Sequence, residues 1–358
     1  MAEFNEYYSC DDVLLVPYYL DSRIDSRSQC DPSFREYSLP LIASCMDTVY
    51  TKELDKCLTD KKIMVWVHRY FKSYKDQLAA ALIPKSSEYR WFAVGRDVDW
   101  IEGLYNKGIR HFVVDMAHGD SHICEQTVKF IKNLKDTKVI AGNVATTSGF
   151  KRLQNAGVWG VRVGIGSGSI CSTRTSTGFG VPLLTSIERC LRAKDTAIII
   201  ADGGIKYPGD IPKAIRFGAD MVVSGRLWAG TKLAAGYCYD KHKMAYCSAY
   251  DLIHAEDEAN GCDENRVYYK VYKGMASKEA RAGILKEASI EGVSGLIEYT
   301  GKTEEFIENL RRNMQSALSY GGAINWAEFR RNVKAIRITP AAWEESRTHV
   351  LQPESVYG

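Results

Sequence analysis

The sequence has no long apolar run, no closely paired cysteines and no large excess of charge of either sign. No stretch approaches the roughly 18 uninterrupted apolar residues of a membrane-spanning helix, so none is expected. The ten cysteines lie far apart and form no CxxC pair. With 47 basic and 44 acidic residues, the formal net charge is only +3. This balance excludes the dense basic patch that nucleic-acid binding requires.

The amino-terminal stretch MAEFNEYYSCDD is polar and acidic, so it does not read as a signal peptide. Scattered cysteines without a secretion signal predict reduced thiols and a cytoplasmic protein. No internal repeat, low-complexity tract or linker divides the 358 residues. We therefore expect residues 1–358 to form one catalytic domain.

Short apolar runs rich in β-branched residues alternate with segments of helical pattern, such as 121–136, 147–157 and 207–218. Each run ends in Gly, Asp, Asn or Ser, which is typical of buried parallel strands followed by helices. Eight such units predict an α/β protein, a (β/α)8 TIM barrel whose chemistry lies at the carboxyl ends of the strands. The runs are 39–49, 62–70, 91–95, 111–121, 138–147, 160–168, 196–204 and 219–226.

After residue 231 the pattern loosens into a polar, tyrosine-rich stretch. We expect residues 231–300 to form a mobile excursion and flap over the barrel mouth. The segment 304–323 then predicts the last amphipathic helix.

One glycine-rich stretch, GIGSGSICSTRTSTGFG (164–180), contains too much glycine for a helix or a buried strand. It lacks the third glycine and the acidic residue of a dinucleotide-binding fingerprint, so a loop after a barrel strand is the better interpretation. Cys171 lies in this loop, where a thiolate can attack an electrophilic carbon. A buried structural cysteine is the alternative interpretation.

Two further glycine turns, in 201–215 and 224–230, follow late strands of the predicted barrel. Neighbouring turns of this kind form the usual phosphate site of the fold, although tight turns need glycine in any case. Arg226 is either a solvated residue at a helix start or an extra phosphate contact. We interpret His68 and His118, which lie at strand ends, as structural hydrogen-bonding residues.

The stretch VGIGSGSICSTRTSTGFGVP resembles the signature loop of the IMP dehydrogenase and GMP reductase family. The resemblance continues along nearly the whole chain, in blocks such as PLIASCMDTV, VVDMAHGDS, AGNVAT, ADGGIKYPGDIPKAIRFGAD and YKGMAS. It implies a (β/α)8 barrel that acts on the purine nucleotides GMP or IMP with a nicotinamide cofactor, as a homotetramer. The balanced charge and the lack of a long apolar run, noted above, predict neither a nucleic-acid partner nor a membrane.

The resemblance also implies roles for individual residues. Cys171 would form a thioimidate at C2 of the purine, and Thr173 and Glu291 would relay protons. The nucleotide would be bound by Ser169, Asp202, Gly203, Gly204, Gly225, Arg226, Tyr272, Gly274, Met275, Ala276 and Ser277. The nicotinamide side would be lined by Arg69, Asp115, Ala117 and Asn143. Backbone carbonyls of Gly166, Gly168 and Cys171 would hold a monovalent cation, potassium in this family.

The resemblance alone does not decide between the two branches of the family, the IMP dehydrogenases and the GMP reductases. Only residues 71–90 separate VHRY from WFAVG, so the CBS-domain insertion of most dehydrogenases is absent. The segment between Met275 and Glu291 lacks the Arg-Tyr pair that activates water in dehydrogenases. Both features favour an NADPH-dependent GMP reductase.

Other features point the other way. ADGGIKYPGDIPKAI and the tail look closer to dehydrogenases, and Ala288 stands where the reductases have an arginine. The alternatives are an NAD-dependent IMP dehydrogenase without CBS domains and a purine-nucleotide-binding protein that has lost catalysis. The retention of Cys171, Thr173 and Glu291 argues against the last, because binding alone needs none of them.

Overall fold

A computed structural model describes residues 6–20, 22–81, 83, 85–236, 238–240, 246–247, 268–274 and 292–346. Its centre is a closed barrel of eight parallel strands in sequence order. This confirms the predicted fold, and each predicted apolar run matches one strand, although β4 begins one residue before its run. The strands are β2 (Leu41–Ala43), β3 (Met64–Val67), β4 (Arg90–Val94), β5 (His111–Asp115), β6 (Lys138–Val144), β7 (Gly160–Val163), β8 (Ile198–Asp202) and β9 (Met221–Ser224).

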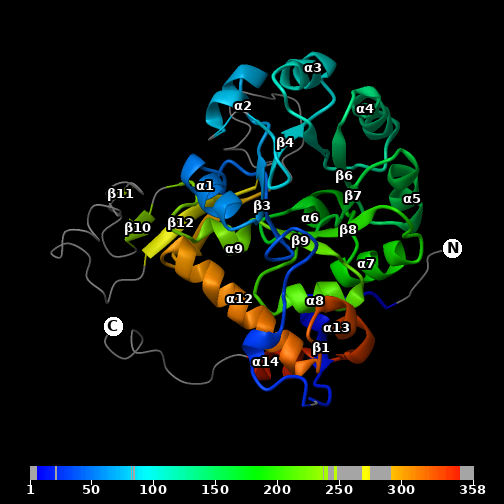
Figure 1. Cartoon of the computed structure of the whole chain (residues 1–358), viewed down its shortest axis with the longest axis vertical. Coiled ribbons are helices and arrows are strands. Elements are labelled where there is room, and N and C mark those ends of the chain that lie inside the picture. The colour runs from blue at the N-terminus through cyan, green and yellow to red at the C-terminus, as the bar shows by residue number, and fades with distance from the viewer. Residues whose placement is uncertain are drawn as a thin grey trace.

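Helices follow the strands and surround the barrel (Figure 1). Several begin at a side chain that accepts a hydrogen bond from the backbone of the first turn, as Ser73, Asp97, Ser121 and Thr146 do. The helices are α1 (Lys52–Asp60), α2 (Tyr74–Ala80), α3 (Val98–Asn106), α4 (His122–Asn133), α5 (Thr147–Asn155), α6 (Thr173–Thr177), α7 (Leu183–Leu191), α8 (Asp210–Phe217), α9 (Arg226–Ala229) and α12 (Thr303–Tyr320).

Two apolar layers hold the barrel together. Inside it, large side chains such as Trp66, Trp91 and Met221 fill the space between the strands and are fully buried. Outside it, the opposite faces of the strands pack against the helices, with Phe92, Phe112 and other fully buried side chains. Strands buried on both faces explain the continuous apolar runs of the sequence.

The residues after β9 include a second sheet that the sequence pattern did not predict. It is antiparallel, in the order β11-β10-β12-β13. Its strands are β10 (Cys238–Asp240), β11 (Tyr246–Cys247), β12 (Tyr268–Lys273) and β13 (Ser294–Glu298). The end of this sheet reaches the glycine-rich loop, because Val293 donates its amide to the Ile170 carbonyl at 3.0 Å. The rest of the expected flap lies outside the described residues and stays a prediction.

The two ends of the described chain meet below the barrel. Strand β1 (Val13–Val16) pairs antiparallel with β14 (Lys334–Arg337), beside α13 (Trp326–Asn332), α14 (Pro340–Glu345) and α8 (Figure 1). Short 3-10 turns at Cys10–Asp12 and Arg27–Gln29 complete the amino-terminal segment. None of the helices in the described residues is long and apolar enough to cross a membrane. Each cysteine whose side chain is described there is a free thiol.

Candidate active site at the mouth of the barrel

A cavity of about 390 Å³ opens at the carboxyl ends of the barrel strands. This volume lies in the range of small-molecule sites, about 300–1,000 Å³. The predicted site residues that line it are Arg69, Asp115, Ala117, Asn143, Gly166, Gly168, Ser169, Cys171, Thr173, Asp202, Gly203, Gly204, Gly225, Arg226, Tyr272 and Gly274. The other four predicted residues, Met275, Ala276, Ser277 and Glu291, lie outside the described part of the chain.

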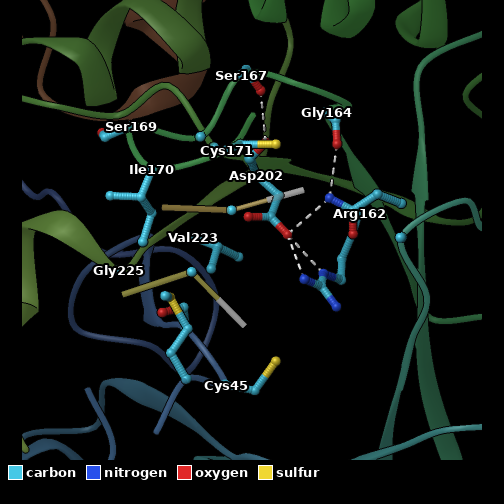
Figure 2. A pocket seen from close by; sticks show the side chains of 18 of the residues that line it. Cys45, Arg162, Gly164, Ser167, Ser169, Ile170, Cys171, Asp202, Val223 and Gly225 are labelled. Atoms are coloured by element: carbon cyan, nitrogen blue, oxygen red, sulfur yellow. Dashed lines mark hydrogen bonds and ion pairs between the residues drawn. The ribbon is translucent and has the colours of Figure 1, made fainter. Parts of the chain in front are cut away.

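Cys171 lies on the loop that follows β7, at one wall of the cavity (Figure 2). Its Sγ lies 3.1 Å from Oγ1 of Thr173, the first residue of α6. The thiol is partly exposed, and its backbone forms a bridge with Gly292 beside the antiparallel sheet. A nucleophile is thus placed within hydrogen-bonding distance of a hydroxyl that can pass on a proton.

The glycine-rich loop lies very close to β8. A Cβ atom on Gly164 would stand 2.0 Å from the carbonyl oxygen of Asp202, and its φ of +147° disfavours other residues as well. The side chain of Ser167 adds a hydrogen bond to the same carbonyl, at 3.3 Å. The glycine therefore brings the cysteine loop against the strand that carries Asp202.

One end of the cavity collects polar groups around Gly225. A Cβ atom there would lie 2.5 Å from the Tyr272 hydroxyl and 3.0 Å from Ser44 Oγ, so only glycine fits. Ser44 Oγ is buried and has no hydrogen-bond partner among the described residues. For Tyr272, which is 7% exposed, the only hydrogen-bond contact there is Met46 Sδ at 3.9 Å. Arg226 lines the same part of the cavity, and both its guanidinium and these hydroxyls can donate hydrogen bonds to an anion.

At the floor of the cavity, two carboxylates share one guanidinium. Arg162 in β7 contacts Asp115 Oδ1 through Nη1 at 2.6 Å. It contacts Asp202 Oδ2 through Nε at 2.8 Å and through Nη2 at 2.7 Å, as Figure 2 shows. Arg69 Nε adds a contact of 3.1 Å to Asp115 Oδ2, and Asn143 Nδ2 lies 3.1 Å from Asp202 Oδ2.

These contacts determine the charge of the cavity floor. Burial alone would raise the pKa of Asp115, but the Arg162 and Arg69 guanidiniums outweigh it and hold that pKa below its ordinary value. The same carboxylates raise the pKa of Arg162 well above its ordinary value, against the effect of its own burial. Asp115 and Arg162 are therefore both charged at neutral pH.

A model of the IMP dehydrogenase / GMP reductase domain matches residues 7–349 of this chain. The chain belongs to this family. The family consists of oxidoreductases that act on purine nucleotides, in agreement with the resemblance of the glycine-rich loop.

Relatives of both branches are similar to the chain. It is 31% identical to the GMP reductase of Oceanobacillus iheyensis over 330 residues, which are 88% of this chain and 91% of that protein. It is 31% identical to the GMP reductase of Leptothrix cholodnii, covering 91% of this chain and 94% of that protein. It is 39% identical to the inosine-5'-monophosphate dehydrogenase of Aquifex aeolicus over 71% of this chain, but spans only 50% of that protein.

Two residues of this family site were not found from the sequence. Arg162 lies inside an apolar strand run, GVRVG. A buried charge in such a run needs a partner of opposite charge, so this arginine could have indicated a buried ion pair. Ser44 follows β2 and lines the cavity, but serine at a strand end is too common to indicate a ligand contact.

Some strand-end residues stand outside the cavity. Asp47 pairs with Lys273 at 2.9 Å and does not line the cavity. His118 is exposed, whereas His68 is buried and stacks on Phe71 with ring centroids 4.2 Å apart. His68 Nδ1 accepts the amide of Tyr70 at 3.2 Å, which requires that nitrogen to be unprotonated and supports the structural interpretation of this residue.

Three residues predicted to hold a cation lie on one turn of the cysteine loop. Backbone carbonyls are hard oxygen ligands, which suit a monovalent cation. The Gly168 carbonyl accepts the Cys171 amide at 3.1 Å and keeps a second lone pair. Gly166 has a φ of +74°. The donor chemistry therefore fits potassium, and the site itself stays a prediction.

Burial lowers the pKa of His68 from its ordinary value of 6.5 to about 4. Between these two values the unfolded chain binds more protons at this site than the folded one, so stability is lost as the pH falls from about 6.5 towards 4. Between pH 7.5 and pH 5, the free energy of unfolding should fall by about 1–2 kcal/mol less in His68→Gln than in the parent. Urea unfolding at both values measures this difference.

The matched control is His122→Gln, because His122 is exposed at the start of α4. Its pH dependence should equal that of the parent. An unchanged pH dependence in His68→Gln would contradict the account of a neutral, buried imidazole.

Proposed function

We propose that the protein is a GMP reductase, which uses NADPH to convert GMP to IMP and ammonia. The observation that supports this most directly is the pair formed by Cys171 and Thr173, 3.1 Å apart at the wall of a nucleotide-sized cavity. The cavity offers partners for each part of a nucleotide. Two carboxylates lie at its floor, and at one end lie an arginine, the Tyr272 hydroxyl and the Ser44 hydroxyl, which has no hydrogen-bond partner among the described residues.

The proposed chemistry begins at the thiol. The Cys171 thiolate adds to C2 of the purine, the 2-amino group leaves as ammonia, and a thioimidate remains on the enzyme. Addition of a hydride to C2 and departure of the thiolate then give IMP. The leaving amine needs a proton, and Thr173 with Glu291 supplies it in this proposal.

The remaining contacts of the nucleotide follow from the cavity. Asp202 accepts hydrogen bonds from the ribose hydroxyls, because its Oδ1 has no partner among the described residues while Oδ2 has three. The 5′-phosphate binds between Ser169, Gly203, Gly204, Gly225 and Arg226, with the Tyr272 and Ser44 hydroxyls. Gly274 with Met275, Ala276 and Ser277 meets the edge of the base.

The cofactor binds on the side of Arg69, Asp115, Ala117 and Asn143. When bound, the reduced nicotinamide supplies the hydride. Held by both guanidiniums, Asp115 stays ionised and offers an acceptor to hydroxyl groups on that side. The carbonyls of Gly166, Gly168 and Cys171 hold a potassium ion, whose charge orders the cysteine loop, and the protein assembles as a homotetramer.

The reductase is favoured over the dehydrogenase by two observations. The matches to two GMP reductases cover 88–91% of this chain and 91–94% of those proteins. The segment 275–291 also lacks the Arg-Tyr pair needed to activate water against the thioimidate. The higher identity to the Aquifex dehydrogenase, 39%, keeps an IMP dehydrogenase as the second candidate.

Product analysis distinguishes the candidates. With GMP and NADPH, we expect loss of absorbance at 340 nm together with release of IMP and ammonia, and little XMP from IMP and NAD⁺. Cys171→Ala should lower this rate by more than about 10³-fold, because the covalent step is lost. Cys57→Ala, at a partly buried thiol of α1 outside the cavity, serves as the control and should keep the parent rate.

Substantial XMP without NADPH-dependent IMP would overturn the reductase and support the dehydrogenase. Binding of GMP without either reaction would support a protein that has lost catalysis.

The phosphate end gives a second prediction. GMP should bind far more tightly than guanosine, since a charge-assisted contact contributes about 1.5–3 kcal/mol. Arg226→Ser should weaken GMP binding by about 10- to 100-fold and leave guanosine binding unchanged. Calorimetry with both ligands tests this. Equal affinities of the parent for GMP and guanosine would refute the placement of the phosphate.

A further inference from the structure

Arg162 occupies an unusual place for a charged side chain, in the middle of a barrel strand. Its side chain is only 9% exposed, and the guanidinium lies 5.2 Å from the centre of the Trp66 ring. The neighbouring strand β6 also approaches Arg162 closely, since a Cβ atom on Gly142 would stand 2.6 Å from Arg162 Cβ. The side chain therefore has little freedom to move on its own.

The contacts of this guanidinium lead to both halves of the cavity. Nη1 holds one oxygen of Asp115, whereas Nε and Nη2 hold one oxygen of Asp202. Asp202 lies on the side of the floor where the nucleotide is proposed to bind, and Asp115 lies on the proposed nicotinamide side. A planar guanidinium fixes the direction of each hydrogen bond, so the orientation of one carboxylate constrains that of the other.

The two carboxylates differ in which of their oxygens the described residues contact. Asp202 concentrates its protein contacts on Oδ2, and no described residue donates to Oδ1. A ligand hydroxyl can therefore bind Asp202 without displacing Arg162. Asp115 is held on both oxygens, by Arg162 and by Arg69, whose side chain is 33% exposed.

We propose that Arg162 is a positioning residue that couples binding of the nucleotide at Asp202 to binding of the dinucleotide at Asp115. A hydroxyl bound at Asp202 orders its carboxylate, and through the shared guanidinium it orders Asp115 before the second ligand arrives. Binding of the second ligand then costs the protein less conformational freedom, which gives positive cooperativity without a large change of structure. The identity of the two ligands rests on the proposed function.

The test is a binding cycle in the Cys171→Ala background, which prevents turnover. The affinity for GMP is measured by calorimetry with and without saturating NADPH, and the affinity for NADPH with and without GMP. For each ligand, the ratio of its affinities with and without the other ligand is taken. If the two binding events are coupled, this ratio is the same for GMP and for NADPH. We expect a ratio of about fivefold or more in the presence of Arg162 and about one in Arg162→Gln.

Arg162→Lys separates charge from geometry. A lysine keeps the positive charge but cannot hold two carboxylates in a fixed direction, so the individual affinities should fall less than in Arg162→Gln while the ratio still approaches one. Should Arg162→Gln not fold, this variant alone decides the question. The control is Arg152→Gln, which breaks an Arg-Asp pair of 2.7 Å on the surface, with a side chain 53% exposed, and should keep the parent ratio.

Two results would overturn the proposal. One is a ratio of one already in the Cys171→Ala protein. The other is a ratio that survives in Arg162→Lys, even if both affinities fall. The same cycle is run with IMP and NAD⁺. Binding of that pair alone would contradict the reductase and still test the coupling, so the two failures are distinguishable.

Discussion

Closure of the barrel between β2 and β9 is the constraint on which the site depends. The two strands pair in parallel with Ala43 opposite Ser224, which brings the first and last turns of the barrel together. The hydroxyl of Ser44, which has no hydrogen-bond partner among the described residues, thus comes to lie beside Gly225, although 180 residues separate them in the chain. Tyr272 enters the same corner from the antiparallel sheet, so this part of the cavity draws on three distant parts of the sequence.

Electrostatics divides this site into regions with different tasks. The floor pairs two carboxylates with two guanidiniums, so each buried charged group there has a partner of opposite sign. The corner around Gly225 carries the Arg226 guanidinium, which has no carboxylate partner among the described residues, and the Ser44 hydroxyl, which has no hydrogen-bond partner there. The Cys171 thiol stands apart from both, on a glycine-rich loop that makes close backbone contact with β8. In the proposed function, this separation lets the sugar, the phosphate and the base of one nucleotide bind at different walls of the cavity.

Much of this arrangement was predictable from the sequence, because strands buried on both faces leave continuous apolar runs that end in polar residues. Each of the eight runs matches one strand, and the polar residues after the strands line one cavity, apart from Asp47, His68 and His118. Arg162 was missed because its contacts are made across strands, and only the folded barrel shows which carboxylates face it. The antiparallel sheet was missed because strands such as YYKVYK carry tyrosine and lysine instead of a clear apolar alternation. The roles given to the site residues remain predictions that geometry supports.

Covalent attachment of the purine to Cys171 is the central claim of this account. The direct measurement mixes the protein with GMP and NADPH, quenches the reaction in acid within a turnover and identifies modified peptides by mass spectrometry. The account predicts an adduct on the peptide that contains Cys171, with the mass of GMP less that of ammonia. Turnover without any adduct, or an adduct on the second thiol that lines the cavity, Cys45, would contradict it.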